Sequence, residues 1–279
     1  PLDVARAPWP AARPKYDLAD LLRRPSSFDS VAVDRLEREL SVARRPVLLI
    51  GAGCVEAIAA ILEFAATRSI PFVTTPQAKG YVHASHPLNK GVFGFAGHMS
   101  AAAALREEAA DLILALGTSF GEWTSAAWSE ALMNQRLIHI DSVEEHFTQS
   151  PMARLHVRGS ITAVFERLLK VGKEREGHES GVWLRAPVVV PLPTVRWDAQ
   201  TGRFNPRECS PSYSVADAQK MRSDDIPLKP QRLMYELSHM FPPQTRFLAD
   251  TGNSTAWSVH YLAPMDRRVS GRRTVVAAK

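Results

Sequence analysis

Residues 45–53 read RPVLLIGAG, an apolar run that ends in two closely spaced glycines. Comparable apolar runs return further along the chain, at residues 70–74, 111–116, 136–140 and, in shorter form, near 154–157. Continuous Val, Ile and Leu without a polar alternate face is typical of strands that are buried on both sides. Because helical patterns separate these runs, the sequence predicts a parallel sheet with right-handed crossovers. The predicted fold class is α/β: a Rossmann-like parallel sheet of about six strands with helices on both faces.

Helical patterns lie before and between the predicted strands. Ser30 is a suitable N-cap, and apolar residues follow it at spacings of three and four, which predicts an amphipathic helix. These residues are Val33, Leu36, Leu40 and Ala43. Residues 54–66 are apolar nearly all round, which predicts a deeply buried helix. Further helices are expected at about 99–109 and 160–170, and the Pro- and Gly-rich stretch from Pro76 to Gly97 is expected to be a loop.

The flanking segments divide the chain further. Prolines interrupt residues 1–29, which predicts an extended arm or linker before a central domain at 30–171. Residues 172–228 are rich in Pro and Gly and are expected to form a linker with a short helix at about 215–222. Residues 229–279 resemble the start of a second, partial α/β unit: a helix from Pro230, a strand at 245–249, a turn and a helix to Tyr261. We expect this truncated unit to dock on the central domain, to swap between chains or to stay mobile.

Composition narrows the function classes. The 279 residues carry a net charge of +5, and the basic pairs are scattered without interleaved aromatic residues, which argues against nucleic-acid binding. An apolar run of membrane-spanning length and a signal segment are both missing from the sequence, so a membrane is not expected as a partner. Cys54 and Cys209 are far apart and neither has a CxxC neighbour, which indicates a reducing, cytoplasmic setting and no zinc site. The chain opens at Pro1, as a domain taken from a longer protein would.

Ligands of open parallel sheets collect outside the carboxyl ends of the strands. The candidate residues at these ends are Gly51, Gly53, Thr75, Gly117 and Asp141. Glycines let a backbone approach a phosphate, hydroxyls donate hydrogen bonds, and a carboxylate holds a ribose diol, so a nucleotide crevice is one hypothesis. The other is that the glycines only make a tight turn. Glu56 stands where the dinucleotide fingerprint needs Gly, and the acidic residue expected after the second strand is missing.

Other polar residues are weaker candidates. His83 and His86 are three apart, but their Pro-flanked loop favours surface histidines over metal ligands. Glu144-Glu145-His146 could carry acid–base chemistry, or it could be the charged first turn of a helix. Cys54 at a helix N-terminus would have a lowered pKa, yet no partner for it is visible in the sequence.

Several short motifs, taken in order, resemble one protein family. They are Arg45-Pro46-Val47 with Gly51-Ala52-Gly53, Ile70-Pro71 with Thr74-Thr75, Lys79-Gly80, His86-Pro87-Leu88 with Gly91 and Gly94, Asp111-Leu112-Ile113-Leu114 with Leu116-Gly117-Thr118, and Ile138-His139-Ile140-Asp141. The chain resembles the central domain of thiamine-diphosphate-dependent enzymes of the acetolactate synthase and 2-oxoacid decarboxylase type. Pro1-Leu2-Asp3-Val4 looks like the end of that family's first domain, and Asp250-Thr251-Gly252 with Trp257 looks like the start of its third.

The resemblance implies a three-domain enzyme that uses thiamine diphosphate and Mg²⁺. In the family, a glutamate of the first domain activates the cofactor, and a Gly-Asp-Gly motif with a downstream Asn in the third domain holds the metal and the diphosphate. Neither segment occurs in this chain, and metal ligands are not expected in it. The turn Gly252-Asn253-Ser254 matches the family's turn near the diphosphate. Its hydrogen-bonding groups suit phosphate oxygens.

Two further expectations concern ligands and partners. Some members bind FAD or ADP on the central domain, at places that match Gly51, Gly53, Thr75, Gly117 and Asp141. This chain has Phe120-Gly121-Glu122-Trp123 where flavin-binding members carry Arg and paired acidic residues. The resemblance implies a largely structural domain that is inactive alone, partners in the remaining domains, and a homo-oligomer at full length. The alternatives are a stand-alone module that binds FAD, NAD or ADP, and a structural interaction protein.

Overall fold

Six parallel strands form the central sheet, in the order β3-β2-β1-β4-β5-β6. The strands are β1 (Pro46–Ile50), β2 (Phe72–Thr74), β3 (Asn89–Val92), β4 (Leu112–Leu116), β5 (Leu137–Asp141) and β6 (Leu155–Arg158). The computed structural model describes residues 27–175, 185–188, 197–204, 211–241, 245–263 and 275–277. The predicted α/β class with a Rossmann-like parallel sheet is confirmed.

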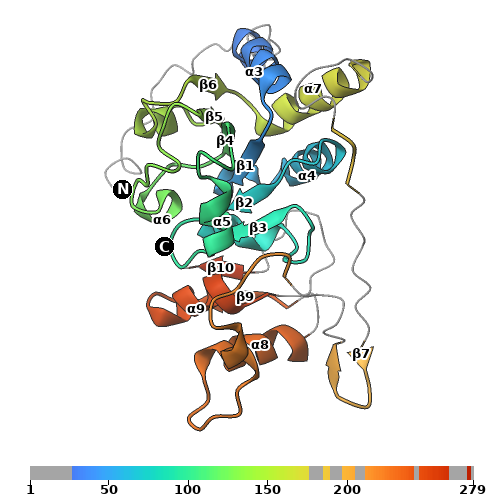
Figure 1. The fold of residues 1–279 in the computed structure, drawn as a ribbon, viewed down its shortest axis with the longest axis vertical. Coiled ribbons are helices and arrows are strands. Elements are labelled where there is room, and N and C mark those ends of the chain that lie inside the picture. Colours follow the sequence, from blue (N-terminus) through green and yellow to red (C-terminus); the bar gives the residue numbers. More distant parts are fainter. Residues whose placement is uncertain are drawn as a thin grey trace, which may run out of the picture.

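Helices cover both faces of this sheet, as predicted. Alternate residues of a strand point to opposite faces, so Leu48 and Ile50 of β1 join one core while Val47 and Leu49 join another. The first core includes residues of α3 (Ser30–Val42), α4 (Ile58–Thr67) and α7 (Ile161–Glu174). The second includes residues of α5 (Met99–Ala104), and α6 (Glu122–Ser125) lies on the same side. Figure 1 shows α4 and α7 on one side of the sheet and α6 on the other.

Side-chain caps fix the ends of two of these helices. The N-cap of α3 is Asp29 rather than the expected Ser30, and its carboxylate accepts the Ala32 N–H at 3.1 Å. Ser160 caps α7 through the Ala163 N–H at 3.4 Å. The predicted apolar stripe of α3 is confirmed, because Val33, Leu36, Leu40 and Ala43 are all buried.

Three predicted elements differ in the structure. The expected loop after β2 contains β3, a short edge strand that the sequence hides because Asn89-Lys90-Gly91-Val92 is not an apolar run. The helix expected at 54–66 begins only at Ile58, after the 3₁₀ turn η1 (Ala52–Cys54), and it exposes Ala59 and Glu63. The helix expected at 99–109 ends at Ala104 and continues as hydrogen-bonded turns.

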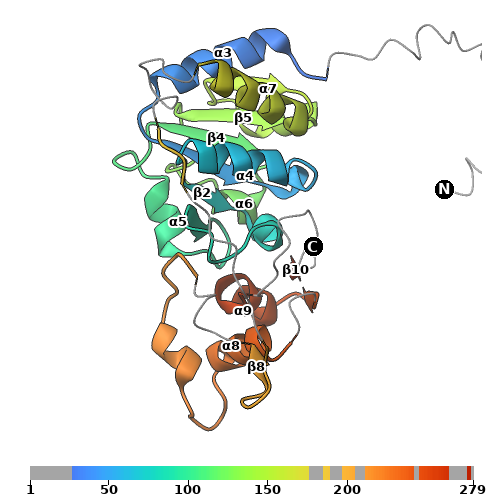
Figure 2. The same cartoon turned by 90° about the vertical axis from the view of Figure 1, so that its right-hand side faces the viewer.

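A smaller α/β unit follows in the described part of residues 211–277. It contains the 3₁₀ helix η6 (Ala218–Arg222), α8 (Pro230–Met240), β9 (Phe247–Ala249), α9 (Asn253–Tyr261) and β10 (Val275–Ala277), which pairs parallel to β9. Met234 and Leu262 are the buried centre of its small core. Figure 2 shows this unit beneath the central sheet. A second α/β unit in this region is thus confirmed, and hydrogen bonds from Lys79 dock it on the central domain, although the sequence did not predict β10.

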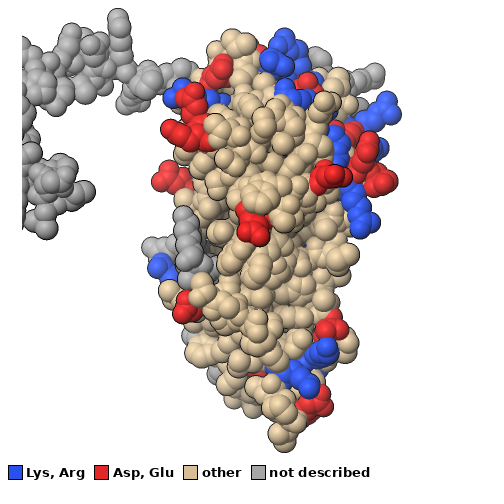
Figure 3. Space-filling view, turned by 90° about the vertical axis from the view of Figure 1, so that its left-hand side faces the viewer, with Lys and Arg blue, Asp and Glu red and all other residues tan. Residues whose placement is uncertain are grey.

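The remaining described segments are short. A hairpin of β7 (Trp197–Asp198) and β8 (Arg203–Phe204) lies within the expected linker. The arm predicted at 1–29 lies outside the described residues except for its last three, where Phe28 bridges Gly159. Figure 3 shows Lys and Arg mixed with Asp and Glu on one face. Within the described ranges, the helices are all too short or too polar to cross a bilayer.

Candidate functional site

Gly51, Gly53 and Gly117 meet where the strand order changes direction, between β1 and β4. In open parallel sheets this switch point is the usual ligand crevice. Here the Gly51 N–H donates to the Leu116 carbonyl at 2.8 Å, and the Gly53 N–H donates to the Gly117 carbonyl at 2.9 Å. These two N–H groups, which the nucleotide hypothesis would direct at a phosphate, are therefore bonded within the protein.

Packing requires two of these glycines, Gly51 and Gly117, and leaves a Cβ on Gly53 tight, at 3.0 Å from the Gly117 Cα. A Cβ on Gly51 would lie 2.3 Å from the Gly117 carbonyl oxygen, and a Cβ on Gly117 would lie 2.8 Å from the Gly53 Cα. Gly117 also has a φ of +56°, in the left-handed region that favours glycine. The two turns thus press backbone against backbone, which accounts for the glycines without any ligand.

Thr75 closes the end of β2 next to this junction. Its side chain is fully buried, and its N–H donates to the Ile50 carbonyl at 2.9 Å. Among the described residues its Oγ1 has no hydrogen-bond partner. A buried hydroxyl without a partner is costly, so Thr75 is the polar group of the crevice that a ligand or a water would satisfy.

Asp141 lies at the end of β5 and is the centre of a histidine cluster. Its Oδ1 accepts the Val143 N–H at 2.9 Å, its Oδ2 lies 2.9 Å from His146 Nδ1, and the same Oδ2 lies 3.6 Å from His139 Nε2. Burial favours the neutral acid, but the interactions with His139, His146 and the Val143 N–H outweigh it and hold the pKa of Asp141 below its ordinary value. The carboxylate that was expected to face a ribose is engaged by imidazoles.

The cluster extends inward through residues that the sequence analysis missed. His139 Nδ1 lies 2.9 Å from Ser150 Oγ, which in turn lies 3.2 Å from His156 Nε2. Burial lowers the pKa of His139. The sequence could have predicted that His139 lies beside Asp141, since the two residues are two apart in a strand and share a face. Of the expected acid–base trio, Glu144 and Glu145 are exposed and only His146 joins the cluster.

Cys54 and His86 were both interpreted wrongly from sequence. Cys54 is buried, its Sγ contacts the Leu116 carbonyl at 3.2 Å, and burial raises its pKa to about 12 instead of lowering it. The helix there is a 3₁₀ turn of three residues, too short to supply a useful dipole. His86 is buried against Phe72, not on the surface, and burial lowers its pKa to about 4. The described ranges contain no group of three or more His, Cys, Asp or Glu that could hold a metal ion.

The turn Gly252-Asn253-Ser254 begins α9 and is exposed. Gly252 has a φ of +102° and open space where a Cβ would stand, so conformation and not crowding favours glycine there. The Ser254 hydroxyl donates to the Asp250 carbonyl at 3.0 Å. The opposite end of α9 is fixed to the central sheet by Lys79, whose Nζ donates to the Ser258 and Val259 carbonyls at 2.8 and 2.6 Å. Sequence reasoning gave Lys79 no role of this kind.

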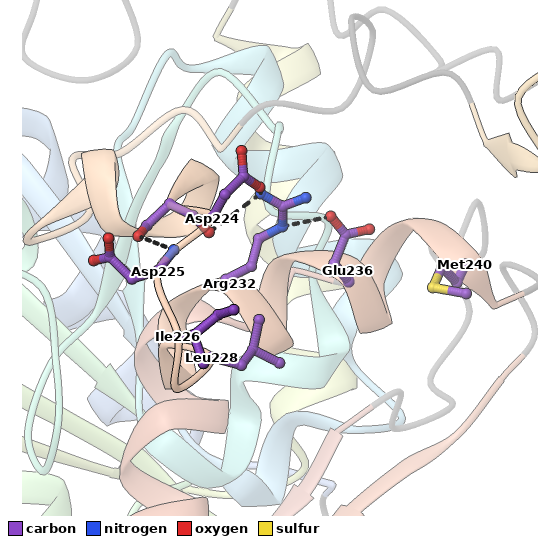
Figure 4. A pocket seen from close by; sticks show the side chains of 8 residues that line it. Asp224, Asp225, Ile226, Leu228, Arg232, Glu236 and Met240 are labelled. Carbon is purple, nitrogen blue, oxygen red and sulfur yellow. Dashed lines mark hydrogen bonds and ion pairs between the residues drawn. The ribbon is translucent and has the colours of Figure 1, made fainter.

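A separate groove of about 410 Å³ lies on the second unit between residues 223–228 and α8. Figure 4 shows Arg232 between Asp224 and Glu236. The guanidinium of Arg232 lies 3.1 Å from the Asp224 carboxylate and 2.7 Å from that of Glu236. The residues predicted for the site do not line this groove.

The geometry defines a Rossmann-like α/β domain in which the Gly51 and Gly53 N–H groups at the switch point are bonded within the protein. Residues 33–168 match the family model described as "Thiamine pyrophosphate enzyme, central domain". The resemblance stated from the sequence is thus confirmed for this segment.

Full-length relatives give the same result. The chain is 27% identical over 225 residues to an acetolactate synthase of Mycobacterium bovis. The aligned segment covers 80% of this chain and 33% of that protein. It is 26% identical over 260 residues to an acetolactate synthase of Mycobacterium leprae, covering 91% and 37%. A 3D-(3,5/4)-trihydroxycyclohexane-1,2-dione hydrolase of Geobacillus thermodenitrificans is 29% identical over 161 residues, covering 52% and 25%. The matched parts thus span 25% to 37% of the length of these relatives.

Proposed function

We propose that this chain is the central, largely structural part of a thiamine-diphosphate-dependent carboligase or decarboxylase that acts on 2-oxoacids, and that it does not turn over substrate alone. The observation that carries the proposal is the strand-end junction of the central sheet. There the Gly51 and Gly53 N–H groups bond to Leu116 and Gly117, and Asp141 is hydrogen-bonded to His146 and lies 3.6 Å from His139. These groups act on the protein itself, as a structural domain requires. The remaining domains of a larger enzyme are its proposed partners, and the full-length protein is proposed to be a homo-oligomer.

The cofactor fits the described residues only in part. Gly252, Asn253 and Ser254 present an exposed helix start, which suits the diphosphate of thiamine diphosphate. The described ranges provide no cluster of metal ligands, so the groups that would hold Mg²⁺ are proposed to come from elsewhere in the enzyme. When bound, the cofactor would supply the carbanion chemistry. The role proposed for this chain is to position the diphosphate turn through the docked α9.

A turnover assay tests the proposal directly. The purified chain is incubated with thiamine diphosphate, Mg²⁺ and pyruvate, and both CO₂ release and acetolactate are measured. We expect no product above a protein-free control. Steady production that scales with the chain's concentration would contradict the structural role.

A binding assay separates this proposal from the stand-alone nucleotide module. The chain is melted with FAD, NAD and ADP in turn, because a ligand that binds the native state stabilises it by about 2.7 kcal/mol at 100 times its Kd. We expect no shift with any of the three. A micromolar Kd that disappears in Thr75→Val would favour the nucleotide module, with Thr75 Oγ1 as its polar contact.

A further inference from the structure

Two histidines join the second unit to the central sheet. His98 begins α5 on the central side, and His260 lies in the last turn of α9. Their rings stack with centroids 4.6 Å apart. Figure 1 shows α9 below β3 and α5. We call the group of four side chains at this junction, His98, His260, Lys79 and Tyr213, the seam.

The hydrogen bonds of His98 require a neutral ring. Its Nδ1 lies 2.9 Å from the Val92 nitrogen and accepts that backbone N–H. Its Nε2 lies 2.9 Å from the His260 carbonyl oxygen and must donate to it. A ring with one accepting and one donating nitrogen carries a single proton. A second proton on Nδ1 would face the Val92 N–H directly.

His260 is fixed in the opposite tautomer. Its Nε2 accepts the Ala216 N–H at 3.0 Å, and its Nδ1 lies 3.1 Å from the carbonyl oxygens of both Ala96 and Gly97. This ring is therefore also neutral, with its proton on Nδ1. Through these contacts it ties α9 to the turn before α5 and to the segment that contains Ala216.

The surroundings of the two rings disfavour a positive charge. The titratable groups that face them are Lys79 from the 3₁₀ helix η2 (Pro76–Tyr81), Tyr213, whose ring lies 4.3 Å from that of His98, and Tyr261 beside His260. Lys79 is buried and bonded to two α9 carbonyls, so any imidazolium would stand beside another cation. Burial, with the repulsion from Lys79, lowers the pKa of His98 to about 3. Burial likewise lowers the pKa of His260.

We infer that the seam is a proton-sensitive interface between the two α/β units: α9 docks on the central sheet only while His98 and His260 are neutral, and acid releases it. A histidine that must stay neutral when docked gives its full contribution above the undocked pKa of about 6.5, and this contribution is lost as the pH falls below that value. For each such histidine, the equilibrium constant for docking falls about tenfold when the pH is lowered from 7.5 to 5.5, because the undocked ring becomes protonated. Lys79, whose pKa burial lowers to about 7, changes docking mainly above pH 7. The inference concerns the chain's own docking and does not rest on the proposed function.

Amide hydrogen exchange of the whole chain tests this inference. Protection of α9, residues 253–261, is measured at pH 7.5 and 5.5 with exchange times corrected for the intrinsic rate, and β4 serves as the internal reference. We expect α9 protection to fall by about tenfold to a hundredfold relative to β4. Equal protection of α9 at the two pH values would overturn the inference.

Substitutions that keep the acceptors but cannot take up a proton identify the groups responsible. In His98→Asn the amide oxygen replaces Nδ1 as the acceptor, and in His260→Gln it replaces Nε2. The double variant should keep α9 protected at both pH values, while the control His239→Gln on α8 should lose protection in acid as the original chain does. The result against the inference is a folded double variant, or a folded single variant, whose α9 loses protection in acid as strongly as in the control. In that case protonation of the two histidines does not cause the release of α9. The measurement on the unsubstituted chain decides the inference by itself if those variants do not fold.

Discussion

Gly51→Ala would place a methyl group 2.3 Å from the Gly117 carbonyl oxygen and 2.7 Å from that of Leu116. Both neighbours are backbone atoms at the ends of packed strands, so the ends of β1 and β4 must separate. Forcing a methyl group into a packed interior costs about 1–3 kcal/mol. Separation also weakens the hydrogen bonds from Gly51 to Leu116 and from Gly53 to Gly117, at about 1 kcal/mol each. The expected loss of unfolding free energy is about 3–5 kcal/mol.

Urea denaturation followed by circular dichroism measures this loss. The matched control is Gly121→Ala, because a Cβ at Gly121 would meet nothing within 4 Å and its φ of −64° suits alanine. We expect the control to cost about 1 kcal/mol or less, because Gly121 is the N-cap of α6, a position where glycine is preferred to alanine. A Gly51→Ala protein that unfolds within 1 kcal/mol of the original would refute the packing explanation and would leave ligand binding as the reason for that glycine.

The other predictions concern individual side chains. Asp141→Asn removes the charge between His139 and His146 and should lower the unfolding free energy by about 1.5–3 kcal/mol, whereas the exposed Glu145→Gln should not. Because the pKa of Asp141 is held below its unfolded value, its contribution is fully present above about pH 3.9 and declines as the pH falls toward the folded value. The Asp141→Asn penalty should therefore be smaller at pH 3 than at pH 7. Cys54 should resist iodoacetamide at pH 8 until the chain is unfolded, as peptide mass mapping would show, because burial raises its pKa to about 12; rapid labelling in the native state would contradict this. Asp29→Ala should cost about 1 kcal/mol by removing the cap of α3, and an unchanged urea midpoint would show that the cap is not formed in solution.

The strands that sequence predicted best are those with the strongest burial. β1, β4 and β5 are buried along their whole length, and an uninterrupted apolar run has few other structural explanations. β3 was missed because an edge strand pairs with one neighbour only and Asn89-Lys90-Gly91-Val92 needs little apolar surface. α5 was predicted too long because the alanines of residues 101–104 favour helix. The chain leaves the helix after Ala104 and buries Leu105 and Ala110 in turns that lead to β4, and this packing depends on the folded structure and not on local propensity.

The candidate site shows why a position is easier to predict than a role. Topology alone put Gly51, Gly117 and Asp141 at the strand ends, and the structure places them there. Whether a strand-end group serves a ligand or the protein depends on its partner atoms, and the partner of Gly51 is Leu116, a residue far along the chain. The protonation of His98 is a stronger case, since its two partners come from the β3 end and from α9. A histidine's tautomer follows from such contacts and from nothing in its own sequence neighbourhood, so chemistry of this kind becomes visible only once the two units are seen docked.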